Sequence, residues 1–206
     1  MNNFRYSAYV VSSVKYPIRK STTYTLLQNL DLFDIHEHEA FYPTSIDKKW
    51  CSMKVGQYGC AASHRLLWKK IIDSEDPSNK WYFVFEDDII LPRDYTSKHI
   101  RFLIQDSMKQ ADEKNVQIIY FGHCWTTLCT HAYACKLDAL KMLYDNTYDC
   151  IKHKSQPIDN QMSDVIIKHK IKTVYVQPSL KNSNNAWGQG IIHQRHGTTM
   201  YDFLRL

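Results

Sequence analysis

Short apolar runs alternate with longer amphipathic stretches along most of the chain, which is typical of an α/β protein whose strands are covered by helices. Strands are expected at residues 6–11, 81–91, 117–121 and 171–176. Helices are expected at residues 18–30, across the apolar positions Leu67, Trp68, Ile71 and Ile72, and at residues 95–114, 132–145 and 159–168. Residues 31–51 read as a loop. This order of elements predicts a three-layer sandwich with a mostly parallel central sheet.

The stretch at residues 81–91 has the most distinctive pattern, because aromatic and β-branched residues lead directly into Glu86, Asp87 and Asp88. A continuous apolar run of this kind predicts a strand that is buried on both faces. Three adjacent carboxylates at its end repel one another, and partial burial adds a desolvation cost. A divalent cation would remove that cost, and Mg²⁺ and Mn²⁺ prefer oxygen ligands. The alternative is a solvated acidic turn that stops at Pro92.

Composition and charge narrow the classes of function. The 206 residues are 44% hydrophobic, enough for a folded core that we predict as one domain over residues 1–206. The formal net charge of +5 suits anionic ligands such as nucleotide phosphates, but it is too small and too dispersed to indicate nucleic-acid binding. The N-terminal residues lack the apolar core of a signal peptide, and no apolar run reaches the length of a membrane span. Six scattered cysteines are therefore expected to be reduced thiols, in a cytoplasmic or otherwise soluble intracellular protein.

Two glycines, Gly56 and Gly59, precede a helix whose first turns carry Ser63 and His64. Backbone N–H groups at a helix N-terminus favour an anion, so both side chains are candidates for contact with a donor phosphate or hydroxyl. The alternative for His64 is a hydrogen-bonded structural role. The segment His36-Glu37-His38-Glu39 suggests a zinc protease, but no second histidine falls at the spacing that such a site requires.

Two polar residues near the end of the chain are further candidates. Asp159 follows the turn at Gln156 and Pro157, where it is well placed to cap the next helix, and capping is the structural alternative to a chemical role. Residues 181–195 are rich in Asn, Gly and Gln and include His193. We expect them to form a loop that orders over a ligand. A surface histidine without a function is the alternative for His193.

Three motifs, taken in order, resemble those of glycosyltransferase family 25, which includes lipopolysaccharide-type and procollagen galactosyltransferases. The first is Gly59-Cys60-Ala61-Ala62-Ser63-His64 with Trp68 one turn later, and the second is Phe85-Glu86-Asp87-Asp88. The third is Ala132-Tyr133-Ala134 followed by Pro157-Ile158-Asp159. Together they span about half of the chain. The opening departs from the family, because Ser12-Ser13-Val14 stands where an asparagine-leucine-aspartate stretch is usual.

The resemblance implies a GT-A-like, Rossmann-like fold, a UDP-sugar donor, a Mn²⁺ or Mg²⁺ cofactor, and an inverting transfer of galactose or glucose to a glycan or protein hydroxyl. Asp88 is the expected first metal ligand, and His193 is a candidate for a further metal or phosphate contact. An inverting displacement needs a base on the acceptor hydroxyl, and Asp159 is the candidate. The expected donor-binding residues are Ser13, Arg19, Gln57, Ser63, His64, Glu86 and Asp87.

Two other classes of function fit the same residues. One is a catalytically inactive module that keeps the fold and binds a nucleotide-sugar without turnover. The other is a different metal-dependent enzyme, a nucleotidyltransferase or phosphohydrolase, built on the same acidic strand. The reaction products separate these alternatives, because a glycosyltransferase releases an intact nucleoside diphosphate whereas the other enzymes cleave between phosphates.

Overall fold

The computed structural model describes residues 5–45, 51, 53–74, 80–91, 95–124, 128–148, 156–176, 189–190 and 193–194. Its strands are β1 (Tyr6–Ser12), β2 (Phe33–Glu39), β3 (Tyr82–Glu86), β4 (Ile89–Ile90), β5 (Ile118–Cys124), β6 (Leu128–Cys135), β7 (Thr173–Tyr175), β8 (Gln189–Gly190) and β9 (His193–Gln194). Its helices are α1 (Pro17–Leu30), α2 (Val55–Ser74), α3 (Ser97–Glu113), α4 (Leu137–Asn146) and α5 (Ile158–His169).

A seven-stranded sheet has the path β2-β1-β3-β6-β5-β7, with β8 paired to β5, and β4 and β9 form a separate two-stranded sheet. β1 is parallel to both β2 and β3, and β5 is parallel to β7. β6 lies antiparallel to β3 and to β5, so it is the one strand on this path that runs against the others. The predicted mostly parallel sheet is therefore confirmed. The carboxyl ends of β1, β2 and β3 meet at one edge, where open α/β sheets bind their ligands.

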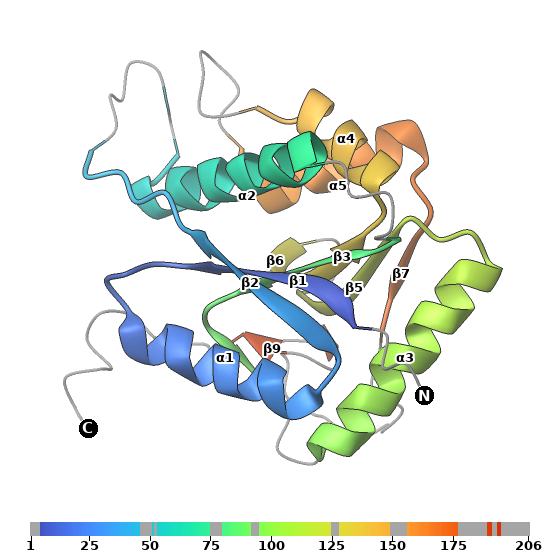
Figure 1. The fold of residues 1–206 in the computed structure, drawn as a ribbon. Coiled ribbons are helices and arrows are strands. Elements are labelled where there is room, and N and C mark those ends of the chain that lie inside the picture. The colour runs from blue at the N-terminus through green and yellow to red at the C-terminus, as the bar shows by residue number, and fades with distance from the viewer. Residues whose placement is uncertain are drawn as a thin grey trace.

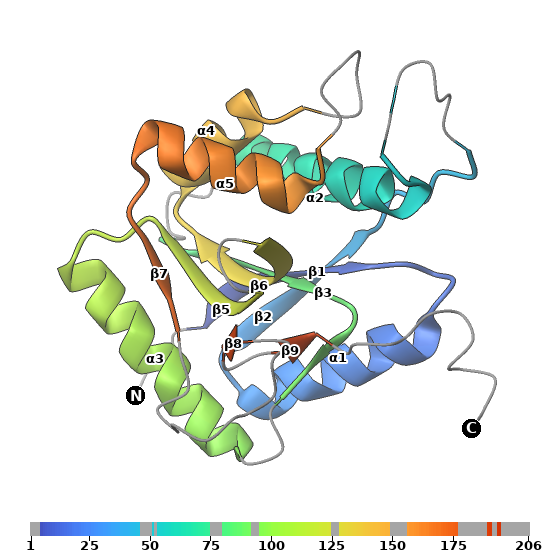
Figure 2. The same cartoon turned by 180° about the vertical axis from the view of Figure 1, so that it is seen from behind.

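Helices cover both faces of the sheet. Figures 1 and 2 show α2, α4 and α5 on one face and α1 and α3 on the other. The side chains of β3 alternate between the two layers: Phe83 and Phe85 pack toward α1 and α3, while Tyr82 and Val84 pack toward α2, α4 and α5. All four are fully buried. Burial on both faces explains the continuous apolar run of this strand, and each large side chain contributes about 1.5–3 kcal/mol of transfer free energy.

Local sequence signals account for the ends of two helices that flank the acidic strand. α1 begins at Pro17, whose fixed φ suits the first helical position, and it ends before Asp31, which has a left-handed φ of 48°. α3 is capped by Thr96, whose side chain accepts a hydrogen bond from the His99 backbone N–H. One face of α3 carries the buried residues Ile100, Ile104, Met108 and Ala111, so this helix is amphipathic and packs that face on the sheet.

Three predicted elements are wrong. The strand expected at residues 81–91 is divided by a turn at residues 87–88 into β3 and β4, which belong to different sheets. Residues 33–39 form strand β2 rather than a loop; this strand lies at the edge of the sheet and is mostly exposed, so its polar composition hid it. Residues 132–135 belong to β6 rather than to the following helix. Ala132, Tyr133, Ala134 and Cys135 are all fully buried in the middle of the sheet. Alanine favours helices intrinsically, but this weak preference is overridden by pairing with both β3 and β5.

The cysteines depart from the predicted pattern. Cys51 is disulfide-bonded, whereas Cys60 and Cys135 are free thiols. The prediction that every cysteine is reduced is therefore wrong for Cys51. The cysteines lend no support to the predicted cytoplasmic location, because disulfides are typical of oxidising compartments. Among the described residues, no helix combines the length and the apolar character that crossing a membrane requires.

Candidate functional site

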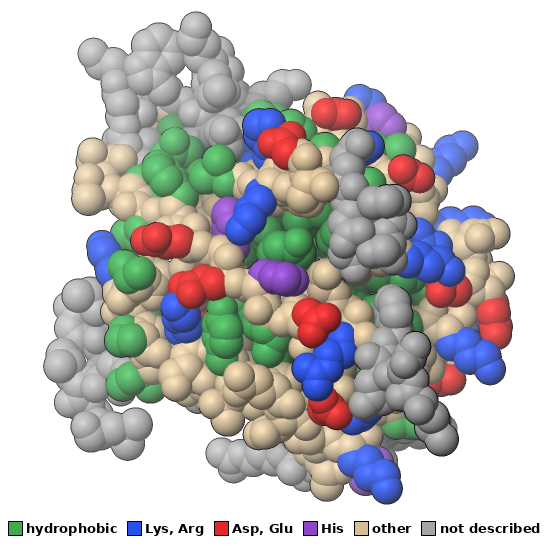
Figure 3. All heavy atoms as spheres, in the orientation of Figure 1, with side chains coloured by type: hydrophobic (Ala, Val, Ile, Leu, Met, Phe, Trp, Pro, Cys, Tyr) green, Lys and Arg blue, Asp and Glu red, His purple; other side chains and the backbone are tan. Residues whose placement is uncertain are grey.

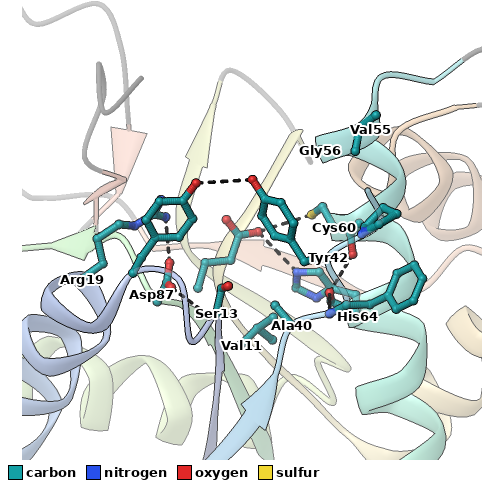
Figure 4. Close-up of a pocket in the computed structure, with 16 residues that line it drawn as sticks. Val11, Ser13, Arg19, Ala40, Tyr42, Val55, Gly56, Cys60, His64 and Asp87 are labelled. Carbon is teal, nitrogen blue, oxygen red and sulfur yellow. Dashed lines mark hydrogen bonds and ion pairs between the residues drawn. The ribbon is translucent and has the colours of Figure 1, made fainter. Parts of the chain in front are cut away.

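A hollow of about 640 Å³, its open mouth included, lies at the carboxyl ends of β1, β2 and β3. Its walls come from the ends of β1 and β3, the start of α1, the segment after β2, and the first turns of α2. Figure 4 shows Arg19 and Asp87 at one end, Cys60 and His64 at the other, and Tyr42 between them. Six of the predicted donor-binding residues line this hollow: Ser13, Arg19, Ser63, His64, Glu86 and Asp87. In the space-filling view of Figure 3, acidic and basic side chains are interspersed over the described surface on that face.

Arg19 contacts both aspartates of the acidic turn between β3 and β4. The Nη2 atom of Arg19 lies 2.7 Å from Oδ1 of Asp87 and 2.8 Å from Oδ2 of Asp88. The Ser13 backbone N–H donates to Oδ2 of Asp87 at 3.2 Å, and the Thr23 hydroxyl donates to the Asp87 carbonyl oxygen at 2.9 Å. Both carboxylate side chains are only 9% exposed, so the alternative of a solvated acidic turn is wrong. Burial raises the pKa of Asp87, and this effect outweighs the lowering by Arg19.

His64 is fully buried and uses both of its ring nitrogens. Its Nε2 atom lies 3.3 Å from Oε1 of Glu86, and its Nδ1 atom lies 2.9 Å from the hydroxyl of Tyr133. The indole N–H of Trp68 donates to the same hydroxyl at 2.8 Å. Because an ionised carboxylate can only accept hydrogen bonds, the contact with Glu86 is made by a hydrogen on Nε2 of His64. A chain of hydrogen bonds thus connects the core of the protein to the carboxylate at the end of β3.

Glu86 receives further donors on the same oxygen. The Thr130 hydroxyl donates to Oε1 at 2.6 Å, and the Cys60 thiol lies 3.8 Å from it. Burial alone would raise the pKa of Glu86, but the contacts with His64 and Thr130 outweigh burial and lower the pKa to about 2. Burial and the charge of Glu86 raise the pKa of the Cys60 thiol well above its ordinary value. At neutral pH the site therefore presents a fixed carboxylate beside a protonated thiol.

Two groups of side chains could hold a cation. In the first, carboxylate oxygens of Asp87 and Asp88 both contact one nitrogen of Arg19, so these two residues are close enough together that they could hold a cation between them. Such an oxygen donor set fits Mg²⁺ or Mn²⁺. In the second, ligand atoms of Cys60, His64 and Glu86 all lie within 4.8 Å of one another. A thiol with an imidazole suits a softer ion such as Zn²⁺ rather than Mg²⁺.

The other predicted residues lie in different places. Ser63 has a structural position, because its hydroxyl donates to the Gly59 carbonyl oxygen at 2.6 Å and accepts from the Phe41 backbone N–H at 2.8 Å. Gln57 is not among the residues that line the hollow, and its side-chain oxygen accepts from the Lys54 backbone N–H at 2.9 Å.

The remaining two candidates, Asp159 and His193, are placed by their elements. Asp159 is in the first turn of α5 rather than at its N-cap, which is Pro157, and its Oδ1 accepts from the Asn160 backbone N–H at 2.9 Å. Its charge is a minor contribution to the raised pKa of Cys60, and Asp159 is not among the residues that line the hollow. His193 pairs with Ile90 in the β4–β9 sheet, so its backbone lies beside the strand that follows Asp88.

The segment after β2 was not predicted from the sequence to be part of the site. Phe41, Tyr42 and Pro43 all line the hollow, and the Tyr42 hydroxyl lies 3.3 Å from that of Tyr16. This segment lies close to α2 at Gly59, where an added Cβ would be 2.9 Å from the Phe41 carbonyl oxygen and 3.1 Å from Cδ of Pro43. The two aromatic residues before a proline were a signal that could have drawn attention to it.

Comparison with solved structures places this fold among GT-A-like glycosyltransferases. A glycosyltransferase involved in the glycosylation of the major capsid of PBCV-1 superposes with a TM-score of 0.56 and 13% identity, over 95% of this chain and 96% of that one. The catalytic domain of Drosophila β1,4-galactosyltransferase 7, solved with xylobiose, superposes with a TM-score of 0.52 and 8% identity, over 91% of this chain and 71% of that one.

The sequence itself identifies the family. The family model described as glycosyltransferase family 25 (LPS biosynthesis protein) matches residues 19–179. The chain therefore belongs to glycosyltransferase family 25, and the resemblance in its three motifs is confirmed. A comparison with curated proteins found no match.

Proposed function

We propose that this glycosyltransferase moves galactose or glucose from a UDP-sugar to a hydroxyl of a glycan or protein acceptor, with inversion at the anomeric carbon and with Mn²⁺ or Mg²⁺ as cofactor. The observation that carries the proposal is the acidic turn. Asp87 and Asp88 lie at the carboxyl edge of the sheet, are largely buried, and are drawn together around a positive charge. The hollow next to them has the apolar walls and the few polar groups that a nucleotide site requires.

The donor diphosphate is bound where positive groups gather. α1 begins beside the hollow, and the N-terminus of a helix favours an anion. Arg19 in its first turn provides a guanidinium, which forms bidentate hydrogen bonds with phosphate oxygens. Lys15, whose Nζ atom lies 3.8 Å from the centre of the Tyr42 ring, adds a second cation near the same end.

The acidic residues have different roles in binding the donor. Asp88, helped by Asp87, would hold the cation, which when bound supplies positive charge that stabilises the leaving nucleoside diphosphate. His193 is a further candidate for this group. Glu86 is kept ionised by its hydrogen bonds, and a fixed carboxylate is suited to accept hydrogen bonds from ribose hydroxyls. His64 orients Glu86 and is a positioning residue in this scheme.

The transfer step is a single displacement. The acceptor oxygen forms a bond to the anomeric carbon while the bond from that carbon to the UDP oxygen breaks, so the configuration inverts. The acceptor proton is taken by a base, for which Asp159 is the candidate, and the electron pair of the broken bond leaves with UDP. The acceptor attacks the face of the donor sugar opposite the diphosphate. The base must therefore lie on the other side of the sugar from Arg19 and Asp88.

Equilibrium binding tests the proposal before any acceptor is known. Isothermal titration of the protein with UDP is expected to give clearly tighter binding with Mn²⁺ than with a chelator. ADP and GDP are the controls for the base, and UMP is the control for the diphosphate. UDP affinity that does not depend on Mn²⁺ or Mg²⁺ would contradict the cation part of the proposal. Equal affinity for UDP and UMP would contradict the diphosphate part.

A further inference from the structure

Arg19 contacts the same two carboxylates that are proposed to hold the cation. One nitrogen of Arg19 contacts a carboxylate oxygen of Asp87 at 2.7 Å and one of Asp88 at 2.8 Å. A side chain from α1 is thus the shared counter-ion of both acidic residues, which are adjacent in sequence and would otherwise repel each other. All three side chains are largely enclosed, with 17% of Arg19 and 9% of each aspartate exposed.

We propose that Arg19 is an internal counter-ion that competes with the divalent cation for Asp87 and Asp88, and that it moves to the donor diphosphate when the donor binds. The cation and the donor then bind together, and neither binds tightly alone. The inference rests on the proposed function, because it presumes a diphosphate-containing donor and a divalent cation at the acidic turn.

Like charges make the competition unavoidable in this geometry. A metal ion that bridged the same two carboxylates would lie within a few ångströms of the guanidinium, and two cations repel strongly at that distance in a partly buried site. The guanidinium must therefore leave the carboxylates before the cation binds them. Arg19 lies one turn or less from the start of α1, so a change of rotamer is enough to redirect its guanidinium along the mouth of the hollow.

The hydrogen bonds of Arg19 are incomplete in its present position. Its Nε atom is buried and has no hydrogen-bond partner among the described residues, while a single Nη atom contacts both carboxylates. Arginine usually makes two parallel bonds to a carboxylate or phosphate. A diphosphate at the mouth would offer more acceptor oxygens than the acidic turn does, and this difference favours the move once the donor is present.

The competition makes a reciprocal prediction. If the donor removes Arg19 from the carboxylates, UDP must strengthen Mn²⁺ binding, and Mn²⁺ must strengthen UDP binding by the same factor. Removing the guanidinium should abolish most of this coupling, because the carboxylates are then available to the cation without the donor. A purely structural ion pair would give the opposite result: its loss would disorder the turn and weaken the cation site.

The experiment measures Mn²⁺ affinity by electron paramagnetic resonance of the free ion, with and without UDP, for the wild type, Arg19→Gln and Arg19→Lys. For the wild type, UDP should strengthen Mn²⁺ binding by about tenfold or more. Arg19→Gln should bind Mn²⁺ about tenfold more tightly than the wild type when UDP is absent, and UDP should add less than about threefold. Arg19→Lys keeps the charge and should stay close to the wild type without UDP. Arg101→Gln, which removes a surface guanidinium paired with Asp31, is the control for net charge.

The outcomes separate this inference from the proposed function. If UDP strengthens Mn²⁺ binding to the wild type but Arg19→Gln binds Mn²⁺ no more tightly than the wild type without UDP, the competition is overturned and the proposed function stands. If no variant binds Mn²⁺ with UDP present, both fail. If the melting curve shows that Arg19→Gln does not fold, Arg19→Lys is the deciding variant. The proposal would also be overturned if folded Arg19→Lys binds Mn²⁺ with wild-type affinity and UDP does not strengthen that binding.

Discussion

The Nδ1 atom of His64 lies 2.9 Å from the hydroxyl of Tyr133, inside the core behind the hollow. Trp68 donates to the same hydroxyl, so a chain of hydrogen bonds runs from Trp68 through Tyr133 and His64 to Glu86. The sequence predicted His64 in the first turns of a helix, where a direct donor contact was expected. α2 begins at Val55, however, so Gly56 and Gly59 belong to the helix and His64 lies well inside it. The geometry instead makes His64 a residue that orients the carboxylate of Glu86.

Tyr133→Phe tests this chain of hydrogen bonds. Loss of the hydroxyl leaves two buried ring nitrogens without their partner, so the free energy of unfolding should fall by about 1–3 kcal/mol. UDP affinity should fall as well, since His64 no longer holds Glu86 in one orientation. The matched control is Tyr120→Phe on the paired position of β5, because the buried Tyr120 hydroxyl has no hydrogen-bond partner in the described part of the chain. Chemical denaturation of both variants is the measurement, and equal losses would contradict the assignment.

Gly59→Ala tests the contact between α2 and the segment at residues 41–43. The new Cβ would be 2.9 Å from the Phe41 carbonyl oxygen, so the segment must shift, at a cost of about 1–3 kcal/mol in stability. UDP affinity should fall because Phe41 and Tyr42 line the hollow. Gly56→Ala is the control: a Cβ there meets nothing within 4 Å, and alanine favours a helix by up to about 1 kcal/mol. Melting temperatures that change in the same direction for both variants would rule out the proposed close approach.

Asp112 gives a prediction about pH that does not involve the site. Partial burial alone would raise its pKa, but hydrogen bonds from Lys80 and Trp81 outweigh burial and lower the pKa below the ordinary 3.8. A depressed pKa contributes stability above the unfolded-state pKa, and that contribution is lost as the pH falls through the folded-state value. Asp112→Asn should therefore lower stability by of order 1 kcal/mol at pH 7, a figure reduced for partial exposure.

Denaturation of Asp112→Asn across a pH series is the measurement. The difference from the wild type should shrink steadily below about pH 4, where the wild-type carboxyl also becomes protonated. Asp106→Asn on the same helix is the control and should change little at any pH, because its carboxylate accepts an exposed hydrogen bond from the uncharged Gln110 one turn away. A deficit for Asp112→Asn that stays constant down to pH 2 would show that its charge is not responsible.

Asp159→Asn separates a chemical role from a structural one. Asparagine keeps the size of the side chain and a hydrogen-bond acceptor for the Asn160 backbone N–H, which lies 2.9 Å from Oδ1, but it cannot take a proton. Transfer should fall by about 10²–10⁴-fold, with the melting curve and UDP affinity nearly unchanged. Single-turnover transfer at saturating acceptor is the measurement. A rate within a few-fold of the wild type would place the base elsewhere, with Asp87 or His193 as the next candidates.

The site could be predicted where it depends on the sheet alone. The apolar run into Glu86 predicts a strand buried on both faces, and in a mostly parallel sheet the carboxyl ends of such strands meet. Ser13 at the end of β1 and Asp87 at the end of β3 are therefore brought together, and a hydrogen bond of 3.2 Å joins them. The positions at which strands end in the sequence are therefore enough to predict neighbours of this kind.

Contacts that depend on tertiary packing could not be predicted. β2 was missed because an exposed edge strand needs no apolar face, and with it the position of Tyr42 was missed. Nothing in the sequence shows that Arg19 contacts both acidic residues, because that contact depends on the rotamer that Arg19 adopts in the folded protein. The disulfide at Cys51 was missed for the same reason: pairing depends on which cysteines the fold brings close.

The metal-dependent transfer of a sugar from UDP is tested most directly by product analysis. Wild type and Asp88→Asn would each be incubated with UDP-galactose and UDP-glucose and with mixed glycan acceptors, with Mn²⁺ or with a chelator. We predict that the wild type releases intact UDP and a glycosylated product only with the cation, and that Asp88→Asn, which keeps a near-normal melting curve, does neither. Equal release by Asp88→Asn, or formation of UMP and a sugar phosphate in place of UDP, would contradict the proposed function.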